Sequence, residues 1–600
     1  MIGAPPPEPR PQTAARGSAW RHAPLLLVFV LLAVYVAPLW RHLDNSPGTF
    51  DTGYTWFIIE VDRTSIADYG QLPLWNPYYC GGAPHLGSPQ TGTLSPFTIP
   101  ILFLGTPIGY RLGYTLGLVA ALLCLRAFAR TLGLSPIAST IAGAGYAVCG
   151  AFAQHLGGGH WVWIPFAFYP IMLRSLHLAL DGQPEQIVWG ALVLTFTIFH
   201  WPIYPMAYAF LVVPIYALYL GLQNGARDWR RLRRALFAAG AMIGLGLAMA
   251  TIRLLPVAVH VAAHPRNVKD FDFTWPYELF ETYGLRHTAR GFGSHQYVFP
   301  EYGNYLGLVG LAFVFCGAYL VVRRRRALWP ILAGMVTFCV FQLGNLKPLP
   351  WWVIKKLPLF NHLRVPSRFT VIAGMFMCVL IGVAVDEWAA PVLARWRSAD
   401  PRARRRGVLV LVAAAVFLVD AVSFNILQWG QTFSAPPYHE PHAASFHQAP
   451  GNRGRMYVYP AANQGSLSCF EETPLEISPR LRPNLPADEY LREPDAGTVR
   501  RIRWSPNRIE LDVDLRRPAT VLVNQNFGAG WHAQGGEIAN EGGLLAARVT
   551  VGHHRVTFSY LPRAVVVGGT ISLLTAAGAA AFVVVSIRRR RRAATTSPSG

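Results

Sequence analysis

Long apolar stretches recur along the chain and are separated by short polar loops. An α-helix needs about 20 apolar residues to cross a bilayer. The pattern predicts twelve transmembrane spans, at residues 24–40, 108–129, 136–154, 161–180, 187–200, 203–222, 235–256, 304–322, 327–344, 369–388, 407–425 and 563–587. The fifth and sixth are joined through HWPIYP, so that pair is alternatively a re-entrant hairpin, and the number of spans around 187–222 stays open.

A second pattern appears near the C-terminus, where apolar and polar residues alternate. The apolar positions are Ile509, Leu511, Val513, Leu515, Val521, Val523, Val556, Phe558 and Tyr560. Alternation bounded by Gly, Pro and Asn is typical of antiparallel strands with one buried face. The sequence therefore predicts a multi-span α-helical membrane protein with a C-terminal β-sandwich-like domain.

The two patterns together divide the chain into five parts. These are a disordered tail over 1–23, a transmembrane domain over 24–425, a β-rich domain over 426–562, a final span over 563–587 and a basic tail over 588–600. Within the transmembrane domain, 41–107 and 257–303 form two large loops. We expect the first span to be a retained anchor, because no small-residue cleavage site follows it.

Charge places these parts relative to the membrane. Only 14% of the 600 residues are charged, yet the net charge is +22. Arginines gather before the first span, after the last one, and in the loops at 227–234, 323–326 and 402–406. Short arginine-rich loops mark the inner side of a membrane. We therefore expect the N-terminus inside and both large loops and the β-domain outside, which explains the net charge without a nucleic-acid partner.

The seven cysteines form no CxxC pair and show no metal-ligand spacing. Five fall within predicted spans, where a small apolar thiol is ordinary packing. Cys80 and Cys469 both fall outside the membrane. A disulfide between these two and two free thiols are both compatible with the sequence.

The loop after the first span carries a candidate catalytic acid, Asp51. A carboxylate can serve as a general base towards a hydroxyl within hydrogen-bond reach. With a polyprenyl-phosphate sugar, phosphate leaves as a stable anion, so one base suffices and a single displacement inverts the anomeric carbon. The alternative is that Asp51 caps a helix beginning at TGYTWF. Other acids on the same loop are Asp44, Glu60, Asp62 and Asp68.

Two further motifs contain candidate binding residues. Trp75 and Tyr78, in PLWNPYYCGGAPHLGSPQTG, can stack on a sugar or lie in the interfacial aromatic belt. His155 and His160, in QHLGGGHWVW, can contact a phosphate or the reacting hydroxyl, or belong to a simple interfacial turn. Two histidines without a third nearby ligand are a weak metal signal.

Several cations lie on the predicted outer side, although the charge pattern otherwise places arginines on the inner side. They are Arg286, His287 and Arg290 before the eighth span, and Lys355, Lys356, Arg364 and Arg368 before the tenth. Arginine matches phosphate oxygens two at a time, so these residues are candidate ligands of a lipid phosphate. Contact with anionic lipid headgroups is the alternative, and it fits the lysines better.

Four segments carry a resemblance to a known family: PLWNPYYCGGAPHLGSPQTG, EYGNYLGLVGL, LPLFNHLRVPSRF and NQNFGAGWHAQ with VGHHRVTFSYLP. Together, and in this order, they resemble the YfhO-like bacterial membrane proteins of the GT-C glycosyltransferase superfamily. The resemblance implies a GT-C-like membrane fold, an active site at the outer surface of the bacterial cytoplasmic membrane, and an acid in the first outer loop as base. Asp51 is the matching position.

We therefore expect an inverting glycosyltransferase that moves a sugar from a polyprenyl-phosphate donor to a glycan, lipid or protein acceptor of the cell envelope. The sequence indicates no cofactor, since it shows no tight carboxylate cluster, although a divalent metal stays open. One alternative is a flippase of lipid-linked sugars, which requires ionisable residues within spans. Arg253 and Asp420 are the main ones here. The other alternative is a non-catalytic assembly scaffold.

Overall fold

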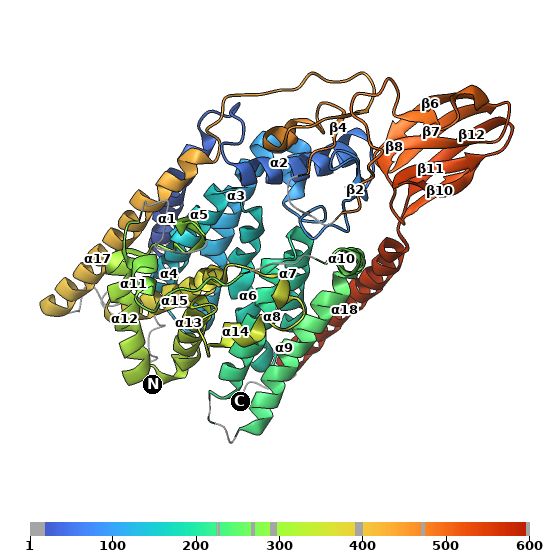
Figure 1. The fold of residues 1–600 in the computed structure, drawn as a ribbon. Coiled ribbons are helices and arrows are strands. Elements are labelled where there is room, and N and C mark those ends of the chain that lie inside the picture. Colours follow the sequence, from blue (N-terminus) through green and yellow to red (C-terminus); the bar gives the residue numbers. More distant parts are fainter. Residues whose placement is uncertain are drawn as a thin grey trace, which may run out of the picture.

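The structure is a computed structural model that describes residues 19–223, 225, 228–265, 270–287, 297–389, 400–469 and 475–595. A bundle of helices forms most of the molecule, and a β-domain stands beside one end of it (Figure 1). The helices up to the middle of the chain are α1 (Ala19–Val36), α2 (Phe50–Arg63), α3 (Thr98–Thr131), α4 (Pro136–Val148), α5 (Gly150–Gly157), α6 (Tyr169–Leu180), α7 (Gln186–His200), α8 (Tyr204–Gly221), α9 (Trp229–Met249) and α10 (Thr251–Ala263). The later ones are α11 (Glu278–Gly284), α12 (Gly307–Arg323), α13 (Trp329–Gln342), α14 (Pro350–Ile354), α15 (Thr370–Trp388), α17 (Pro401–Asn425) and α18 (Arg563–Thr595).

Eight helical segments in the described part of the chain are long and apolar enough to cross a membrane. Helices α12 and α13 form a ninth candidate, bent by 117° at the arginines between them. The predicted spans 24–40 and 187–200 correspond to apolar helices that are shorter than this. The predicted class of a multi-span helical membrane protein is confirmed, but eight or nine spans pass this test rather than twelve. The difference arises because these two helices are short and because the predicted spans 304–322 and 327–344 form the one bent pair.

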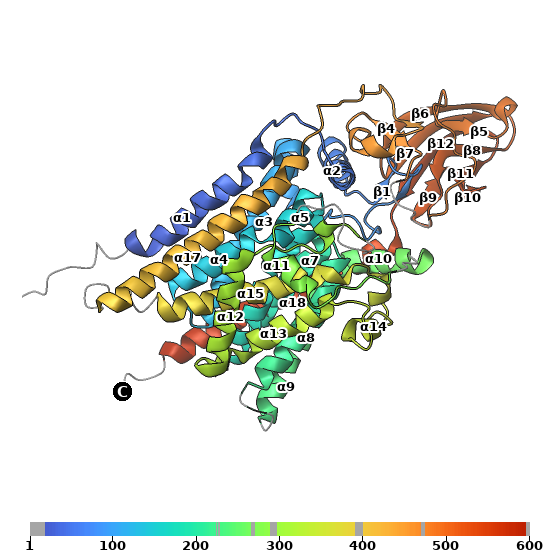
Figure 2. The ribbon, with the colours of Figure 1, turned by 60° about the vertical axis from the view of Figure 1, so that its left-hand side comes forward.

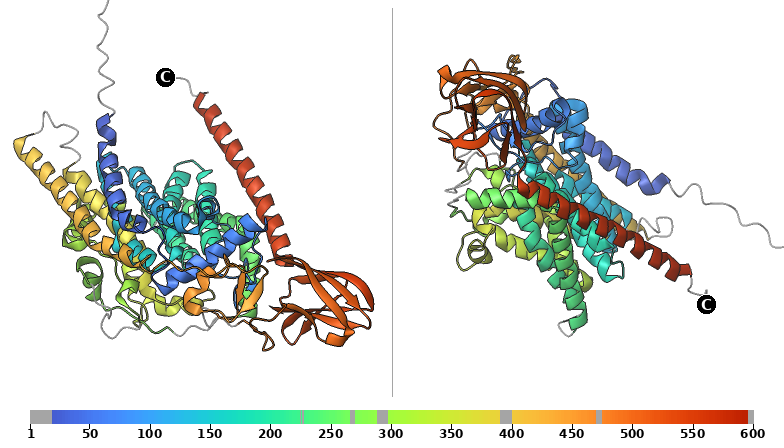
Figure 3. Two further views of the ribbon diagram at one scale, coloured as in Figure 1. Left: turned by 90° about the horizontal axis from the view of Figure 1, so that it is seen from above. Right: turned by 90° about the vertical axis from the view of Figure 1, so that its right-hand side faces the viewer.

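Helix α15 lies at the centre of the bundle and is buried throughout its apolar window. Helix α18, by contrast, is mostly exposed, since only 11% of its apolar window is buried inside the molecule. It leaves the β-domain and runs along α9 to the far end of the bundle (Figure 3). There Arg590 pairs with Glu185, in the loop before α7. The basic end of α18 therefore meets a loop that the charge pattern places on the inner side.

The β-domain consists of two four-stranded antiparallel sheets, in the orders β10-β11-β8-β5 and β6-β7-β12-β9. Its strands are β5 (Glu489–Leu491), β6 (Gly497–Ser505), β7 (Arg508–Leu515), β8 (Ala519–Asn526), β9 (Trp531–Gln534), β10 (Glu537–Glu541), β11 (Leu544–Val549) and β12 (Gly552–Tyr560). The alternating apolar residues predicted from the sequence, such as Ile509, Val521 and Phe558, are buried in one shared core. Before this domain, β3 (His447–Ala449) pairs with β4 (Gln464–Ser466).

The first outer loop joins the bundle to the β-domain, with α2 between them (Figure 2). Strand β1 (Trp75–Asn76) pairs with β2 (Ala83–Pro84). The indole N–H of Trp75 donates to Gln525 at 2.9 Å, and its ring contacts Trp531 and Tyr560 of the β-domain core. A disulfide links Cys80 of this loop to Cys469, across 389 residues of sequence. The loop is therefore a structural part of the outer domain.

Candidate active site

Helix α2 lies in the first predicted outer loop and carries Asp51 in its first turn. The helix is capped by Thr49, whose hydroxyl accepts the backbone N–H of Thr52 at 3.2 Å. The proposed capping role of Asp51 is thus taken by Thr49. The Asp51 side chain is 50% exposed, so its carboxylate is available to a substrate.

The glycine-rich turn after α5 packs against this helix start. The Thr49 hydroxyl donates to the carbonyl of Gly158 at 3.1 Å, and the Thr55 hydroxyl donates to that of Gly159 at 2.9 Å. Gly159 has a φ of +100°, and a Cβ there would lie 2.2 Å from the backbone nitrogen of Thr52. Only glycine fits both the conformation and the close approach. This contact brings the turn, and with it His160, beside Asp51.

His155 and His160 form a hydrogen-bonded chain that ends on Asp51. Nε2 of His160 lies 3.3 Å from Oδ2 of Asp51, and the Nδ1 atoms of the two histidines are 2.9 Å apart. His155 is buried, stacks on Trp163 at 3.6 Å between ring centroids, and its Nε2 has no hydrogen-bond partner. One assignment satisfies these contacts: Nδ1–H of His155 donates to Nδ1 of His160, and Nε2–H of His160 donates to Asp51. The chain then directs a hydrogen bond at one carboxylate oxygen of Asp51.

Glu301 is a member of the site that the sequence reasoning did not single out. It precedes α12, in a short 3₁₀ turn over Phe299–Glu301, and its Oε2 lies 3.9 Å from Nδ1 of His155. Arg368 donates two hydrogen bonds of 2.7 Å to its two oxygens. Burial works to raise the pKa of Glu301, but the attraction of Arg368 outweighs it and holds the pKa well below its usual range. Glu301 opens the segment EYGNYLGLVGL, which was the available signal.

A pocket of about 100 Å³ lies beside Asp51. Asp51 and His160 line it together with Arg364 and Arg368, so four of the predicted residues meet at one place. Arg368 is buried under the rings of Tyr204 and Trp163 and is neutralised by Glu301. Arg364 has no carboxylate partner among the residues that the structure describes. Arg364 is therefore the cation of this pocket that is available to an anionic ligand.

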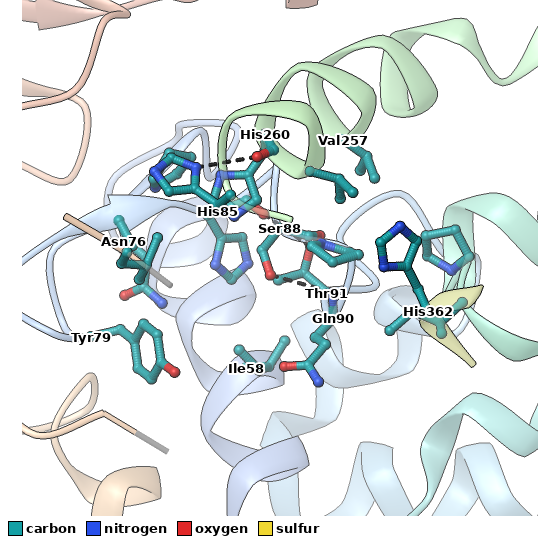
Figure 4. Close-up of a pocket in the computed structure, with 18 of the residues that line it drawn as sticks. Ile58, Asn76, Tyr79, His85, Ser88, Gln90, Thr91, Val257, His260 and His362 are labelled. Atoms are coloured by element: carbon teal, nitrogen blue, oxygen red, sulfur yellow. Dashed lines mark hydrogen bonds between the residues drawn. The ribbon is translucent and has the colours of Figure 1, made fainter. Parts of the chain in front are cut away.

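A larger and mainly apolar cavity, of about 160 Å³, adjoins this pocket (Figure 4). The two share Tyr54, Gln90 and Ile203, and the Tyr54 hydroxyl donates to Gln90 at 3.0 Å. The other lining residues come from α2, the first outer loop, α8, α10 and the segment before α15, and they include Ile58, His85, Met206, Val257, His260, His264, His362 and Leu363. The site thus has a polar end at Asp51 and an apolar end beside α8 and α10.

A metal was left open by the sequence, and the structure brings three residues that can ligate a metal together. The ligand atoms of His155, His160 and Glu301 all lie within 4.8 Å of one another. However, both oxygens of Glu301 already accept from Arg368. The two histidine nitrogens are 2.9 Å apart, closer than the ~3.3 Å that tetrahedral zinc bonds imply. As arranged, these residues form a hydrogen-bonded chain, and metal dependence stays open.

The remaining predicted residues lie elsewhere. Arg286 pairs with Asp420 and donates to Ser423, near the outer end of α17. Arg290 lies outside the described residues. Trp75 and Tyr78 are buried where the first outer loop meets the β-domain, so the structure places them in packing and away from the pocket. Neither residue lines the Asp51 pocket. Their rings instead hold the loop in place.

Two other acids of the first outer loop have partners of their own. Asp62 is buried, 2.8 Å from His85 and 2.6 Å from the Thr93 hydroxyl. Glu60 accepts from Arg63 at 2.7 Å. These bonds lie within the loop itself. Asp51 is the acid of this loop that the structure combines with histidines and arginines in a pocket.

No family model matches the sequence, and no curated protein matches it. Solved structures that resemble it include the arabinofuranosyltransferase AftD from Mycobacteria, with a TM-score of 0.44 and 15% identity over 76% of this chain and 32% of AftD. The archaeal oligosaccharyltransferase AglB from Archaeoglobus fulgidus, in complex with an inhibitory peptide and a dolichol-phosphate, gives 0.45 and 12% over 76% of this chain and 65% of AglB. ArnT from Cupriavidus metallidurans, bound to undecaprenyl phosphate, gives 0.40 and 12% over 74% of this chain and 78% of ArnT.

The chain thus spans about a third of AftD and 65% of AglB. Each of these three TM-scores is below 0.5, so the likeness is partial. The resemblance to YfhO-like proteins stays a prediction from the sequence.

Proposed function

We propose that this protein is an inverting membrane glycosyltransferase of the GT-C type. It takes a sugar from a polyprenyl-phosphate donor and transfers it to a hydroxyl of a cell-envelope acceptor, at the outer face of a bacterial cytoplasmic membrane. The observation that carries the proposal is the pocket in which the exposed carboxylate of Asp51 faces the same space as Arg364 and Arg368. A base for the acceptor and cations for the donor phosphate are the two requirements of this reaction.

The reaction is one displacement. Asp51 accepts the proton of the acceptor hydroxyl while that oxygen attacks the anomeric carbon from the face opposite the phosphate. The bond between the anomeric carbon and the phosphate oxygen breaks, and its electron pair stays on the phosphate. The products are a glycoside of inverted configuration and polyprenyl phosphate, and Asp51 releases its proton to solvent.

The histidines and arginines have separate tasks in this scheme. His160 donates to Asp51 and keeps its second oxygen directed at the acceptor. Arg364 binds the phosphate and stabilises the charge that develops on it. Arg368 is already bound to Glu301, so it acts mainly by fixing Glu301 beside His155. The adjoining apolar cavity accepts the part of the donor next to the phosphate.

The flippase alternative requires ionisable residues that serve a translocation path. Arg253 is fully buried but donates to the carbonyls of Ser88 and Thr91, each at 2.7 Å, and thereby anchors the first outer loop. Asp420 pairs with Arg286 and accepts from Tyr305 at 2.7 Å. Both residues have structural partners. This favours a role in fixing the loops on the bundle over a role in a translocation path.

The test is a transfer assay with purified full-length protein, a panel of polyprenyl-phosphate sugars and envelope extract. Mass spectrometry reads released polyprenyl phosphate and glycosylated product. We expect turnover by the wild type and by Asp68→Asn, whose carboxylate lies on the same loop, and a loss of 10²-fold or more in Asp51→Asn. Turnover should persist in EDTA. Equal transfer by a well-folded Asp51→Asn protein contradicts the assignment of the base.

A further inference from the structure

A second polar cavity lies on the other side of α2 from the active-site pocket. Its volume is about 660 Å³, within the roughly 300–1,000 Å³ of ligand sites. Trp56 and Glu60 of α2 line this cavity, whereas Asp51 and Thr55 of the same helix line the active-site pocket. One helix therefore forms a wall of both spaces.

Segments distant in sequence build the other walls. They are the loop before α2, the break in α3, and two stretches before the β-domain, with Asp44, Gly105, Tyr438 and Tyr457 among them. Gly105 has a φ of +74° and interrupts α3. The backbone N–H of Tyr438 donates to the Ser46 hydroxyl at 3.1 Å. The walls are thus held in place by the fold itself.

The lining combines aromatic rings with carboxylates. Trp56, Tyr438 and Tyr457 contribute rings with an apolar body, on which the apolar face of a sugar ring can stack. The carboxylates of Asp44, Glu60 and Glu440 also line the cavity. Carboxylate oxygens are acceptors only, so they suit a ligand with many hydroxyl donors.

The charge of the residues that line this cavity argues against binding of the polyprenyl-phosphate donor there. Its three carboxylates face one guanidinium, that of Arg63, which pairs with Glu60 at 2.7 Å. The excess of negative charge repels a phosphate. In the active-site pocket, by contrast, Arg364 is a cation that is available to an anionic ligand. The two sides of α2 therefore suit an uncharged and an anionic ligand, respectively.

We propose that this cavity binds a neutral, hydroxyl-rich glycan segment and is the acceptor subsite of the enzyme. The inference rests on the proposed glycosyl transfer, whose acceptor class it names. Donor and acceptor then approach α2 from opposite sides, and Asp51 lies in the first turn of that helix.

The test measures glycan binding directly, without turnover. Full-length protein in detergent is titrated by calorimetry with cellotetraose, maltotetraose and xylotetraose. We expect at least one to bind, and the Asp44→Asn/Glu440→Gln double variant to bind it at least tenfold more weakly. Asp495→Asn is the matched control, since this carboxylate is exposed in the β-domain, and it should bind like the wild type. A thermal melt confirms that the double variant is folded.

The outcomes separate this inference from the proposed function. Asp51→Asn should bind the tetrasaccharide like the wild type, so binding without any transfer by the wild type refutes the enzyme but keeps the glycan site. No binding of any tetrasaccharide, or equal binding by the double variant, overturns the inference. Binding of Ca²⁺ alone, lost in the double variant, also overturns it, because the carboxylates would then form a cation site.

Discussion

Arg368 donates two hydrogen bonds of 2.7 Å to the carboxylate of Glu301. The pair joins the turn before α12 to the start of α15, and only 5% and 15% of the two side chains are exposed. Because Glu301 also lies beside His155, the pair connects the framework of the bundle to the histidine chain that reaches Asp51.

Breaking this pair should destabilise the protein strongly. Glu301→Gln leaves the Arg368 charge buried without a counter-ion, which costs about 3–5 kcal/mol. A thermal melt of the purified protein measures the effect. The Glu301→Gln/Arg368→Met double variant should be less destabilised than either single variant. The control is Glu387→Gln, whose partner Arg324 is exposed, with an expected cost of about 0–1 kcal/mol.

The same pair predicts a pH dependence of stability. The pKa of Glu301 is lowered in the folded state, because Arg368 overcomes the effect of burial. Its stabilisation is therefore complete above the unfolded-state pKa of about 4.3 and is lost as the pH falls towards the folded-state value. Melting temperature should drop below about pH 4 in the wild type and drop less in Glu301→Gln. Parallel curves for the two proteins are evidence against this coupling.

His160 should affect catalysis through Asp51 and leave donor binding intact. His160→Gln removes the imidazole that lies 3.3 Å from the carboxylate. We expect kcat to fall by about tenfold or more, because the base loses its orienting donor, with KM for the donor nearly unchanged. Steady-state kinetics measure kcat and the KM for the donor separately. A rise in KM alone would instead assign His160 to donor binding.

Gly159 should be required for the position of Asp51. In Gly159→Ala the new Cβ meets Thr52 N and Asp51 C, at 2.2 and 2.6 Å, so the turn or the start of α2 must move. Transfer should fall at least tenfold. The matched control is Gly225→Ala, with a φ of +98° but no atom within 4 Å of its Cβ. It carries the same conformational strain without the clash and should keep full transfer.

Arg364 should determine affinity for the donor. In Arg364→Gln the pocket loses its available cation, so KM for the polyprenyl-phosphate sugar should rise at least tenfold. Arg364→Lys should recover part of this, since lysine retains the charge but not the paired geometry. Arg286→Gln is the control, because Arg286 pairs with Asp420 outside the pocket. An equal rise in KM for Arg286→Gln would contradict the placement of the donor.

The disulfide should stabilise the outer domain. It closes a loop of 389 residues between Cys80 and Cys469, and cross-links of this kind contribute about 2–4 kcal/mol. The Cys80→Ser/Cys469→Ser variant should melt at a lower temperature and be cleaved faster by protease near the first outer loop. Cys316→Ala, a free cysteine, controls for loss of a thiol. Mass spectrometry of the alkylated protein verifies the bond.

Local patterns of the sequence predicted a large part of the fold. Apolar runs identified the membrane helices, and the alternation at Ile509, Leu511 and Val513 identified strands whose alternate side chains are buried. Both patterns arise from the geometry of a single element, so they can be read without knowing its neighbours. Asp51 was a candidate from the sequence because it is an acid on the loop after the first predicted span.

Tertiary packing alone decided which of the candidates belong together. Glu301 and Arg368 are 67 residues apart, and His160 and Asp51 are 109 apart. Packing also places Trp75 in the β-domain core and pairs Arg286 with Asp420. Hydropathy and spacing describe how each segment meets water or lipid. The site depends on which segments meet each other, and that is set by contacts such as the close approach of Gly159 to Thr52.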